Sequence, residues 1–172
     1  GHQPAENGEL TQSCFSQWWP AEFWSIAHTY CCMEQFMMAA KAELFGDEEI
    51  RAQILEAGIK QIKALGRKVR NFDQTLWDRA KYSIVLNGSW CKFSQNRALR
   101  DFLLSTGDSV LAEASPFDGV WGIHLSAASP EARDPLKWRG ENLLGFALME
   151  VRDELRRVTQ YEALCDWSVV ER

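Results

Sequence analysis

The sequence predicts a single, mainly α-helical domain with a small β element, an α+β fold dominated by its helices. Apolar residues recur at helical spacing in several segments, and Asp or Gly residues stand where those helices should begin or end. Two short apolar runs, 110–114 and 120–125, are the predicted strands. The chain has 172 residues, of which 46% are hydrophobic and 25% charged, so it can bury one substantial core.

We expect the domain to span residues 14–158. Residues 1–13 are polar and lack periodicity, which predicts a flexible leader, and 159–172 form a C-terminal tail. Aromatic residues crowd positions 14–30, where Pro20 interrupts any helix, so short extended pieces and turns are expected there.

The first three helices are predicted from residues that are typical of helix starts and ends. Helix-forming residues fill 33–44, and Gly46 follows as a stop. Asp47 suits the capping position of a second helix, which Gly58 ends. A short helix follows at 59–65, so three helices succeed one another with little chain between them.

Longer helices are predicted in the rest of the chain. Asp73 caps a helix that runs toward Phe93, and 96–106 carries an apolar face. The segment 126–138 contains two prolines and is a predicted loop. The last helix, 140–155, places apolar residues at a strict helical period, and these are Leu144, Leu148, Val151 and Leu155.

Composition limits the classes of function. A formal net charge of −5 offers no basic footprint for general binding to nucleic acid or acidic membranes. No apolar run has the length of a transmembrane helix, so we expect no membrane association. We also expect a cytoplasmic location and a monomer or weak homo-oligomer. Five cysteines without paired spacing predict reduced thiols, and three histidines without a Cys-x-x-Cys motif predict neither a metal site nor a cofactor.

Glu34 and Lys41 are the first candidates for chemistry. They lie seven residues apart in the predicted first helix, nearly two turns, so their side chains leave one face. Met37 and Met38 lie between them, and burial in such an apolar stripe moves the pKa values of both groups toward the range that catalysis uses. A surface ion pair at the margin of a core helix is the alternative interpretation.

Several peptides occur in a distinctive order along the chain. They are FSQW at 15–18, MEQFMMAAKA at 33–42, LFGD at 44–47, KFSQN at 92–96, LLSTG at 103–107, LAEASPFD at 111–118, WGI at 121–123 and WRGENLLGFALM at 138–149. In this order and spacing they resemble the YbiA-like, or NADAR, family over roughly residues 14–156. Three positions depart from the usual pattern: Gln17 where many members have Asn, Gln35 where His is frequent, and His124 where Gly is common.

The resemblance implies an N-glycosidase that hydrolyses the bond between a base and a ribosyl group. Two substrate classes are associated with the family, ADP-ribose attached to guanine in nucleotides or DNA, and phosphoribosyl pyrimidine intermediates of riboflavin synthesis. We expect the first. A non-catalytic sensor that binds ADP-ribose or NAD is an alternative of another class, and it predicts loss of the carboxylate or the lysine, both of which are present.

The resemblance implies that Glu34, Lys41, Asp118 and Trp121 match the family's catalytic motif, and that Asn142 and Gly145 match its last motif; of these, Glu34, Lys41 and Asp118 are the expected catalytic residues. Cleavage at an anomeric carbon passes through an oxocarbenium-like state, which one carboxyl group serves by protonating the leaving group and another by stabilising positive charge or activating water. Lys41 opens another route, because a neutral amine captures the released aldehyde equivalent as a Schiff base. The alternatives are a turn-forming role for Asp118 and a lysine at a helix end whose ammonium reaches solvent.

Substrate binding needs a phosphate site and a surface for a flat ring. Arg67 follows a helix stop and could hold phosphate, unless 67–70 is only a solvated charge run. The start of the last helix, near 140–142, could add an anion site. The candidates for stacking on a base are Trp121 and the Trp18–Trp19 pair, although we prefer a core role for that pair. The residues expected to bind substrate are Trp121, Asn142, Ser16, Trp18, Arg67 and Gly122.

Overall fold

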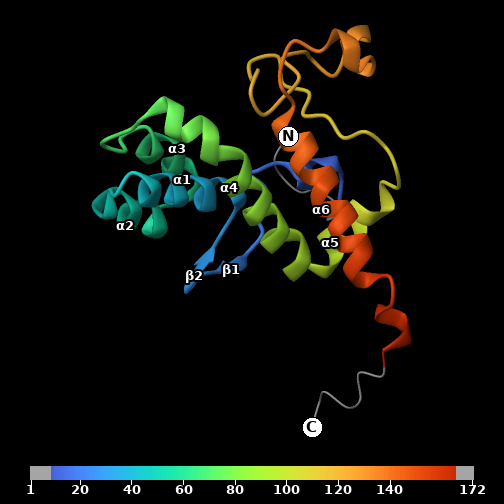
Figure 1. The fold of residues 1–172 in the computed structure, drawn as a ribbon, viewed down its shortest axis with the longest axis horizontal. Helices are drawn as coiled ribbons and strands as arrows, with labels where there is room; N and C mark the ends of the chain where they lie inside the picture. Colours follow the sequence, from blue (N-terminus) through green and yellow to red (C-terminus); the bar gives the residue numbers. More distant parts are fainter. Residues whose placement is uncertain (1–8, 166–172) are drawn as a thin grey trace.

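The computed structural model describes residues 9–165 and shows a mainly helical fold (Figure 1). In chain order its α-helices are α1 (Met33–Leu44), α2 (Glu48–Glu56), α3 (Ile59–Gly66), α4 (Gln74–Gln95), α5 (Arg97–Ser105) and α6 (Leu143–Thr159). Short 3-10 turns lie at η1 (Gln12–Phe15), η2 (Pro130–Arg133), η3 (Pro135–Lys137) and η4 (Glu162–Leu164). Positions 1–8 of the predicted leader and 166–172 of the predicted tail lie outside the described residues.

The predicted fold class is confirmed, and all six predicted helices are present within a few residues of their expected ends. The carboxylate of Asp47 accepts a hydrogen bond from the N–H of Ile50 and caps α2, while that of Asp73 accepts one from Leu76 and caps α4. Gly46 adopts a φ of 68° just after α1, a backbone conformation that glycine tolerates without strain.

The short extended pieces expected at 14–30 are confirmed by two strands, but the strands predicted at 110–114 and 120–125 are absent. Among the described residues the only sheet pairs β1 (Phe23–Ser25) with β2 (His28–Tyr30) in antiparallel register. The segments 110–114 and 120–125 contain no strand. They meet through the bond from the Ile123 N–H to the Glu113 carbonyl, but the carbonyl oxygens of 119–122 turn toward the start of α6, so no ladder can form between them.

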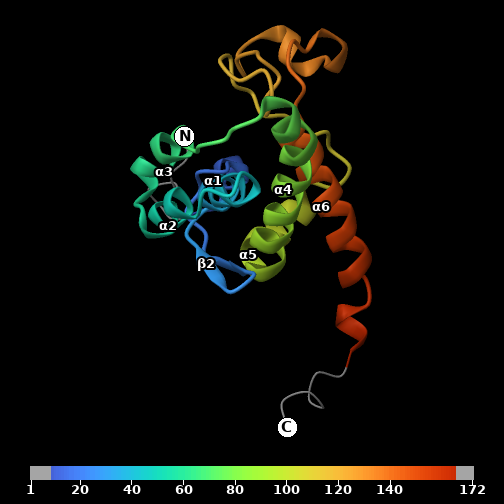
Figure 2. The same ribbon diagram turned by 60° about the vertical axis from the view of Figure 1, so that its left-hand side comes forward.

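The helices pack in two groups that share α4. Helix α1 packs against α2 and α3 on one side and against α4 on the other, and α6 packs against the opposite flank of α4 (Figures 1 and 2). Helix α5 closes the same end of α4 and α6. The predicted apolar stripe of α6 is buried at all four positions, Leu144, Leu148, Val151 and Leu155. The long loop between α5 and α6 caps the amino end of α6 in both views.

A buried lysine on α4 fixes the segment that precedes β1. Lys92 is fully buried, and its Nζ donates to the carbonyl oxygens of Cys14 (2.6 Å) and Ser16 (3.0 Å). Desolvation lowers the pKa of Lys92 to about 8. The N–H of Glu34 in turn donates to the carbonyl of Gln17 at 2.8 Å. Residues 14–17 are therefore held between α4 and the first turn of α1.

The amino end of α6 is occupied by the protein's own backbone. Four successive N–H groups there donate to four carbonyl oxygens of the preceding loop, with the pairs Glu141–Gly119, Asn142–Gly122, Leu143–Val120 and Leu144–Trp121 at 2.9–3.2 Å. The anion site expected at 140–142 is therefore not available, because its donors are already used. The same bonds fix the loop 118–122 against α6. A side chain at Gly140 would meet the carbonyl of Gly122 at 2.2 Å, so this approach requires glycine.

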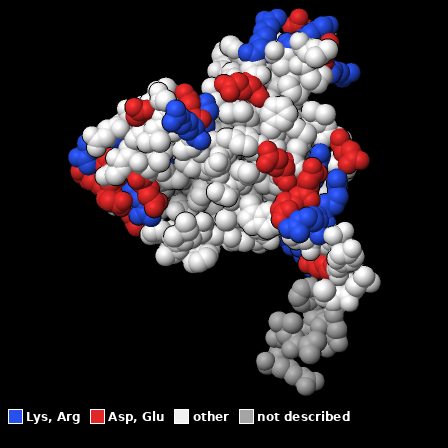
Figure 3. Space-filling model, in the orientation of Figure 1, with Lys and Arg blue, Asp and Glu red and all other residues white. Residues whose placement is uncertain are grey.

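The charged side chains are mixed in sign over the face drawn in Figure 3, where acidic and basic groups alternate at the periphery around an uncharged centre. This face shows no continuous basic track of the kind that follows a nucleic acid backbone. No helix in the described part of the chain has the length and apolar character needed to cross a membrane.

Asn142 joins the loop at 111–113 to α6. Its side chain is fully buried, with Nδ2 donating to the carbonyl of Leu111 (2.9 Å) and Oδ1 accepting from the N–H of Glu113 (3.0 Å), and its φ is 53°. Asn142→Ala should lower the free energy of unfolding by about 2–4 kcal/mol, because it removes the hydrogen bonds of two part-buried backbone groups and places Ala at a positive φ. Urea denaturation measures this change.

The exposed neighbour Glu141 provides the control, since Glu141→Ala keeps its backbone bond and should change the free energy of unfolding by less than about 0.5 kcal/mol. Equal effects of the two substitutions would show that the Asn142 bonds do not hold this loop.

Candidate active site

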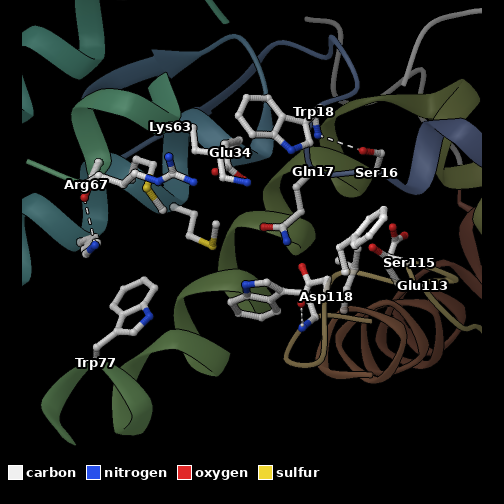
Figure 4. Close-up of a pocket in the computed structure, with 17 residues that line it drawn as sticks. Ser16, Gln17, Trp18, Glu34, Lys63, Arg67, Trp77, Glu113, Ser115 and Asp118 are labelled. Carbon is white, nitrogen blue, oxygen red and sulfur yellow. Dashed lines mark hydrogen bonds between the residues drawn. The ribbon is translucent and has the colours of Figure 1, made fainter. Parts of the chain in front are cut away.

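A cavity of about 450 Å³ lies where α1, the end of α3, the start of α4 and the loop 113–121 meet (Figure 4). It is lined by Ser16, Gln17, Trp18, Glu34, Met37, Met38, Lys41, Lys63, Gly66, Arg67, Trp77, Glu113, Ser115, Phe117, Asp118, Trp121 and Leu144. Seven of the nine residues expected to form the site are among them: Glu34, Lys41, Asp118, Trp121, Ser16, Trp18 and Arg67. Segments far apart in the sequence therefore converge on one hollow.

The other two expected residues, Asn142 and Gly122, do not line this cavity. Asn142 is buried behind the wall, where its amide bonds the backbone of 111–113. A Cβ at Gly122 would lie 2.7 Å from the carbonyl oxygen of Glu113 and 3.0 Å from that of Asp118, so this position needs glycine for close packing. In the described structure both residues support the loop that carries Asp118 and Trp121.

Glu34 lies in the first turn of α1 and is 6% exposed. Burial raises the pKa of its carboxyl from 4.5 to about 7; Lys63 opposes this shift and Asp118 adds to it. The carboxyl group is therefore protonated in an appreciable fraction of molecules near neutral pH. That is the state that a general acid requires.

Asp118 faces the same cavity from the loop that follows Pro116. One of its carboxylate oxygens accepts hydrogen bonds from the N–H groups of Val120 (3.0 Å) and Trp121 (2.8 Å). The predicted turn-forming role is therefore present, and it coexists with a position on the cavity wall. These bonds fix the orientation of the carboxylate relative to Glu34, whose pKa it influences.

Lys41 closes the far end of the α1 stripe. Its Nζ donates to the carbonyl of Gly66 (2.9 Å) and lies 4.4 Å from the ring centroid of Phe72 and 5.8 Å from that of Trp77. Burial lowers the pKa of this amine below its ordinary value. A lowered pKa increases the neutral fraction, which is the nucleophilic form.

Two basic residues lie near each other at the end of α3. Lys63 and Arg67 both line the cavity and are exposed, and within the described chain neither forms a salt bridge with an acidic residue. Arg70, considered with Arg67 in the sequence, is instead engaged by the buried carboxylate of Asp47, which accepts from its backbone N–H and its guanidinium. Of the basic residues at 67–70, only Arg67 lines the cavity, and Lys63 joins it there from α3.

The tryptophan pair at 18–19 divides between two environments. Trp19 is 5% exposed and belongs to the core, as preferred from the sequence. Trp18 is only partly buried and lines the cavity, so the core role preferred for it is wrong. A three-residue turn that Ser16 stabilises, by accepting from the Trp18 N–H at 3.1 Å, separates the directions of the two rings.

The three departures from the family pattern have different surroundings. Gln35 is buried and structural: its amide donates to the carbonyls of Ile54 and Leu55 and accepts from the N–H of Cys31. His124 is exposed, with a φ of 55°. Only Gln17 lines the cavity.

Several lining residues were missed in the sequence. Lys63 had a usable signal, because it stands four positions before Arg67 and so shares its helix face. Trp77, Glu113 and Phe117 come from separate elements, and their arrival at one cavity depends on tertiary packing. Among residues 9–165, no three His, Cys, Asp or Glu side chains are grouped as ligands for a metal ion.

The carboxyl groups of Glu34 and Asp118 and the amine of Lys41 lie on the wall of one cavity, a combination suited to the cleavage of a glycosyl bond. Comparison with known proteins agrees. A family model described as the NADAR domain matches residues 5–156. The N-glycosidase R617 of Acanthamoeba polyphaga mimivirus is 46% identical over 146 residues, which cover 81% of this chain and 86% of that protein. An N-glycosidase of Nostoc punctiforme is 30% identical over 151 residues, covering 84% and 86%.

The fold has a counterpart among solved structures. The NMR structure of the Escherichia coli protein YbiA matches with a TM-score of 0.73 at 23% identity, covering 92% of this chain and 86% of that one. The chain belongs to the NADAR family, and the relatives named here carry the name N-glycosidase, a class of hydrolase that acts on N-glycosyl bonds.

The raised pKa of Glu34 predicts a pH dependence. If Glu34 is the acid, kcat/KM should fall as pH rises through about 7, because the proton to be donated is lost there. Glu34→Gln should reduce kcat on the order of 10²–10⁴-fold and remove this alkaline limb. Initial rates from pH 5 to 9 test both effects, and an unchanged limb in the variant would exclude Glu34 as its source.

The same group links stability to pH. Because its folded-state pKa exceeds the unfolded value, wild-type stability should fall between pH 4.5 and about 7. Glu34→Gln removes this loss, on the order of 3 kcal/mol. Glu56→Gln, at an exposed position, is the matched control and should follow the wild-type pH profile.

Proposed function

We propose that this protein is an N-glycosidase that removes ADP-ribose from guanine bases of nucleotides or nucleic acid. The observation that carries the proposal is the placement of Glu34 and Asp118 on the walls of one cavity, with Lys41 on the same helix face as Glu34. A sensor module requires neither a proton donor nor a neutral amine, so the convergence of all three groups favours an enzyme.

In this proposal each group has its own role. Protonated Glu34 donates its proton to the base nitrogen as the C–N bond breaks, so that the base leaves uncharged. The Asp118 carboxylate, fixed by the two N–H groups that point at it, stabilises the positive charge on the ribosyl ring or accepts a proton from water. Water then adds to the anomeric carbon and gives free ribose at that end.

Lys41 offers a covalent route to the same product. Its neutral Nζ attacks the anomeric carbon as the C–N bond to the base breaks, and Glu34 protonates the departing base nitrogen. The Lys41 nitrogen then loses a proton, the C1′–O4′ bond of the ring breaks with O4′ taking up a proton, and the C=N bond of a protonated imine forms. Water hydrolyses the imine and restores the amine. The lowered pKa of Lys41 and its place in the lining of the cavity support this route.

The size of the binding region supports the longer substrate. A second hollow of about 540 Å³ shares Trp77, Asp118 and Trp121 with the main cavity, so a ligand can extend beyond the scissile ribose. Lys63 and Arg67 supply two positive charges at the cavity for a phosphate group. A phosphoribosyl pyrimidine, the alternative substrate, carries a single nucleoside and would leave the second hollow unused.

A side-by-side assay tests the function. Purified protein should release ADP-ribose from ADP-ribosylated guanosine and from DNA that carries it at an accessible end, with a higher kcat/KM than for the phosphoribosyl pyrimidine. Chromatography of both products measures the two rates. Preference for the pyrimidine would assign the alternative substrate, and binding of ADP-ribose without any cleavage would assign the sensor role.

Lys41 should form an adduct with the sugar that borohydride reduces. Borohydride added during turnover should trap the ribosyl product on Lys41, because an imine is reduced to a stable amine. Peptide mass spectrometry locates the adduct. Lys41→Arg should abolish trapping, since a guanidinium stays protonated and cannot attack.

Lys63→Arg is the matched control, because it replaces another lysine of the same cavity, on α3, with arginine. It should keep the adduct at Lys41. Product formation without an adduct, together with a near wild-type rate for Lys41→Arg, would leave the two carboxyl groups and water as the whole mechanism.

A further inference from the structure

Gln17 places an unpaired polar group in the active-site cavity. The residue is 7% exposed, and its Oε1 is buried without accepting a hydrogen bond from any residue in the described part of the chain. A buried carbonyl oxygen that is left unpaired costs free energy, so proteins rarely keep one without a use. A ligand that brings a donor to this position would remove that cost.

The backbone around Gln17 is held from two sides. Its carbonyl accepts the N–H of Glu34 at 2.8 Å, which places the residue beside the first turn of α1. The preceding carbonyls of Cys14 and Ser16 accept from the buried Nζ of Lys92. The backbone from which the Gln17 side chain extends is therefore fixed by its neighbours.

The direction of the side chain indicates what it meets. Figure 4 shows the Gln17 amide extending into the cavity between Glu34 and Asp118, the two groups that must flank the anomeric carbon during cleavage. A neutral amide neither donates nor takes up a proton in this reaction. Its oxygen accepts a hydrogen bond, and the nearest donors on a ribosyl substrate are the sugar hydroxyls next to the anomeric carbon.

We propose that Gln17 is a specificity-determining residue whose Oε1 accepts a hydrogen bond from the 2′-hydroxyl of the ribose at the scissile bond. This assignment rests on the proposed N-glycosidase function. A hydrogen bond to the hydroxyl beside the anomeric carbon strengthens as positive charge develops on the ring, so it favours the transition state over the ground state. The enzyme then selects ribosyl over 2′-deoxyribosyl substrates.

A substrate and variant cycle tests this contact. Wild type, Gln17→Met and the control Leu144→Met are assayed on the substrate and on its analogue that lacks the 2′-hydroxyl. The analogue is intrinsically more labile, so only ratios between proteins are compared. Gln17→Met should lose about 10- to 100-fold in kcat/KM on the ribosyl substrate and match the wild type on the analogue. Leu144→Met, at an apolar position of the same cavity, should affect both substrates equally.

Thermal unfolding separates this role from a structural one. Because the oxygen has no partner in the protein, Gln17→Met should keep or raise Tm. A clear drop in Tm, or an equal loss of rate on both substrates, would overturn the assignment. Equilibrium binding of the two compounds, measured in Glu34→Gln with and without Gln17→Met so that turnover is largely removed, tests the contact apart from catalysis. Tighter binding of the ribosyl compound only where Gln17 is present supports the assignment and equal binding overturns it, whereas failure of the proposed function would appear as absent cleavage by the wild type.

Discussion

The burial of the Glu34 carboxyl group is the constraint on which the site depends. Glu34 lies in the first turn of α1, where the helix dipole favours a carboxylate, yet desolvation is the larger effect and raises its pKa to about 7. That outcome requires walls on every side. Residues 14–18 supply one wall, and they stay in place because Lys92, itself buried, bonds two of their carbonyl oxygens. Lys92 in the core therefore helps to maintain the surroundings that raise the pKa of Glu34 in the site.

The opposite wall is built from backbone hydrogen bonds. Four N–H groups at the start of α6 hold the carbonyls of 119–122, and Asp118 accepts two more N–H groups within the same loop. In this arrangement the amino end of α6 cannot bind an anion, because its N–H groups bond the loop. The same bonds fix the position of the loop, although no strands flank it. With that helix end occupied, the proposed phosphate-binding groups are the side chains of Lys63 and Arg67, at the end of α3.

Local signals account for what the sequence could predict. Capping by Asp47 and Asp73, the glycine stops and the period of α6 each act within one or two turns, so the helices were predicted nearly in full. The stripe from Glu34 to Lys41 is also local. The prediction of strands within 110–125 was wrong because Val, Ile and Leu indicate burial, whereas strand pairing also depends on a partner segment elsewhere. Here the N–H groups at the start of α6 already bond the carbonyl oxygens that a strand ladder would need.

The same reasoning explains the site residues that were placed differently. Asn142 and Gly122 occur in motifs beside the catalytic positions, but motif membership does not distinguish a group that contacts a ligand from one that supports the wall. Trp18 and Trp19 are adjacent and chemically identical, yet Trp18 lines the cavity and Trp19 is buried in the core, and nothing in their local sequence separates the two roles. Gln17 could be noticed as a departure, but its unpaired oxygen is a property of the folded cavity alone.

Direct titration of the Glu34 carboxyl group is the sharpest test of whether burial makes this group an acid near neutral pH. Carbon-13 NMR of protein labelled at glutamate side chains, with Glu34→Gln used to assign the resonance, gives its pKa without substrate or turnover. We expect a pKa of about 7 in the wild type and a lower pKa in Asp118→Asn, because Asp118 contributes to the upward shift. A value near the ordinary 4.5 that does not respond to Asp118→Asn would contradict this expectation, since Glu34 would then be a solvated carboxylate and not a buried acid.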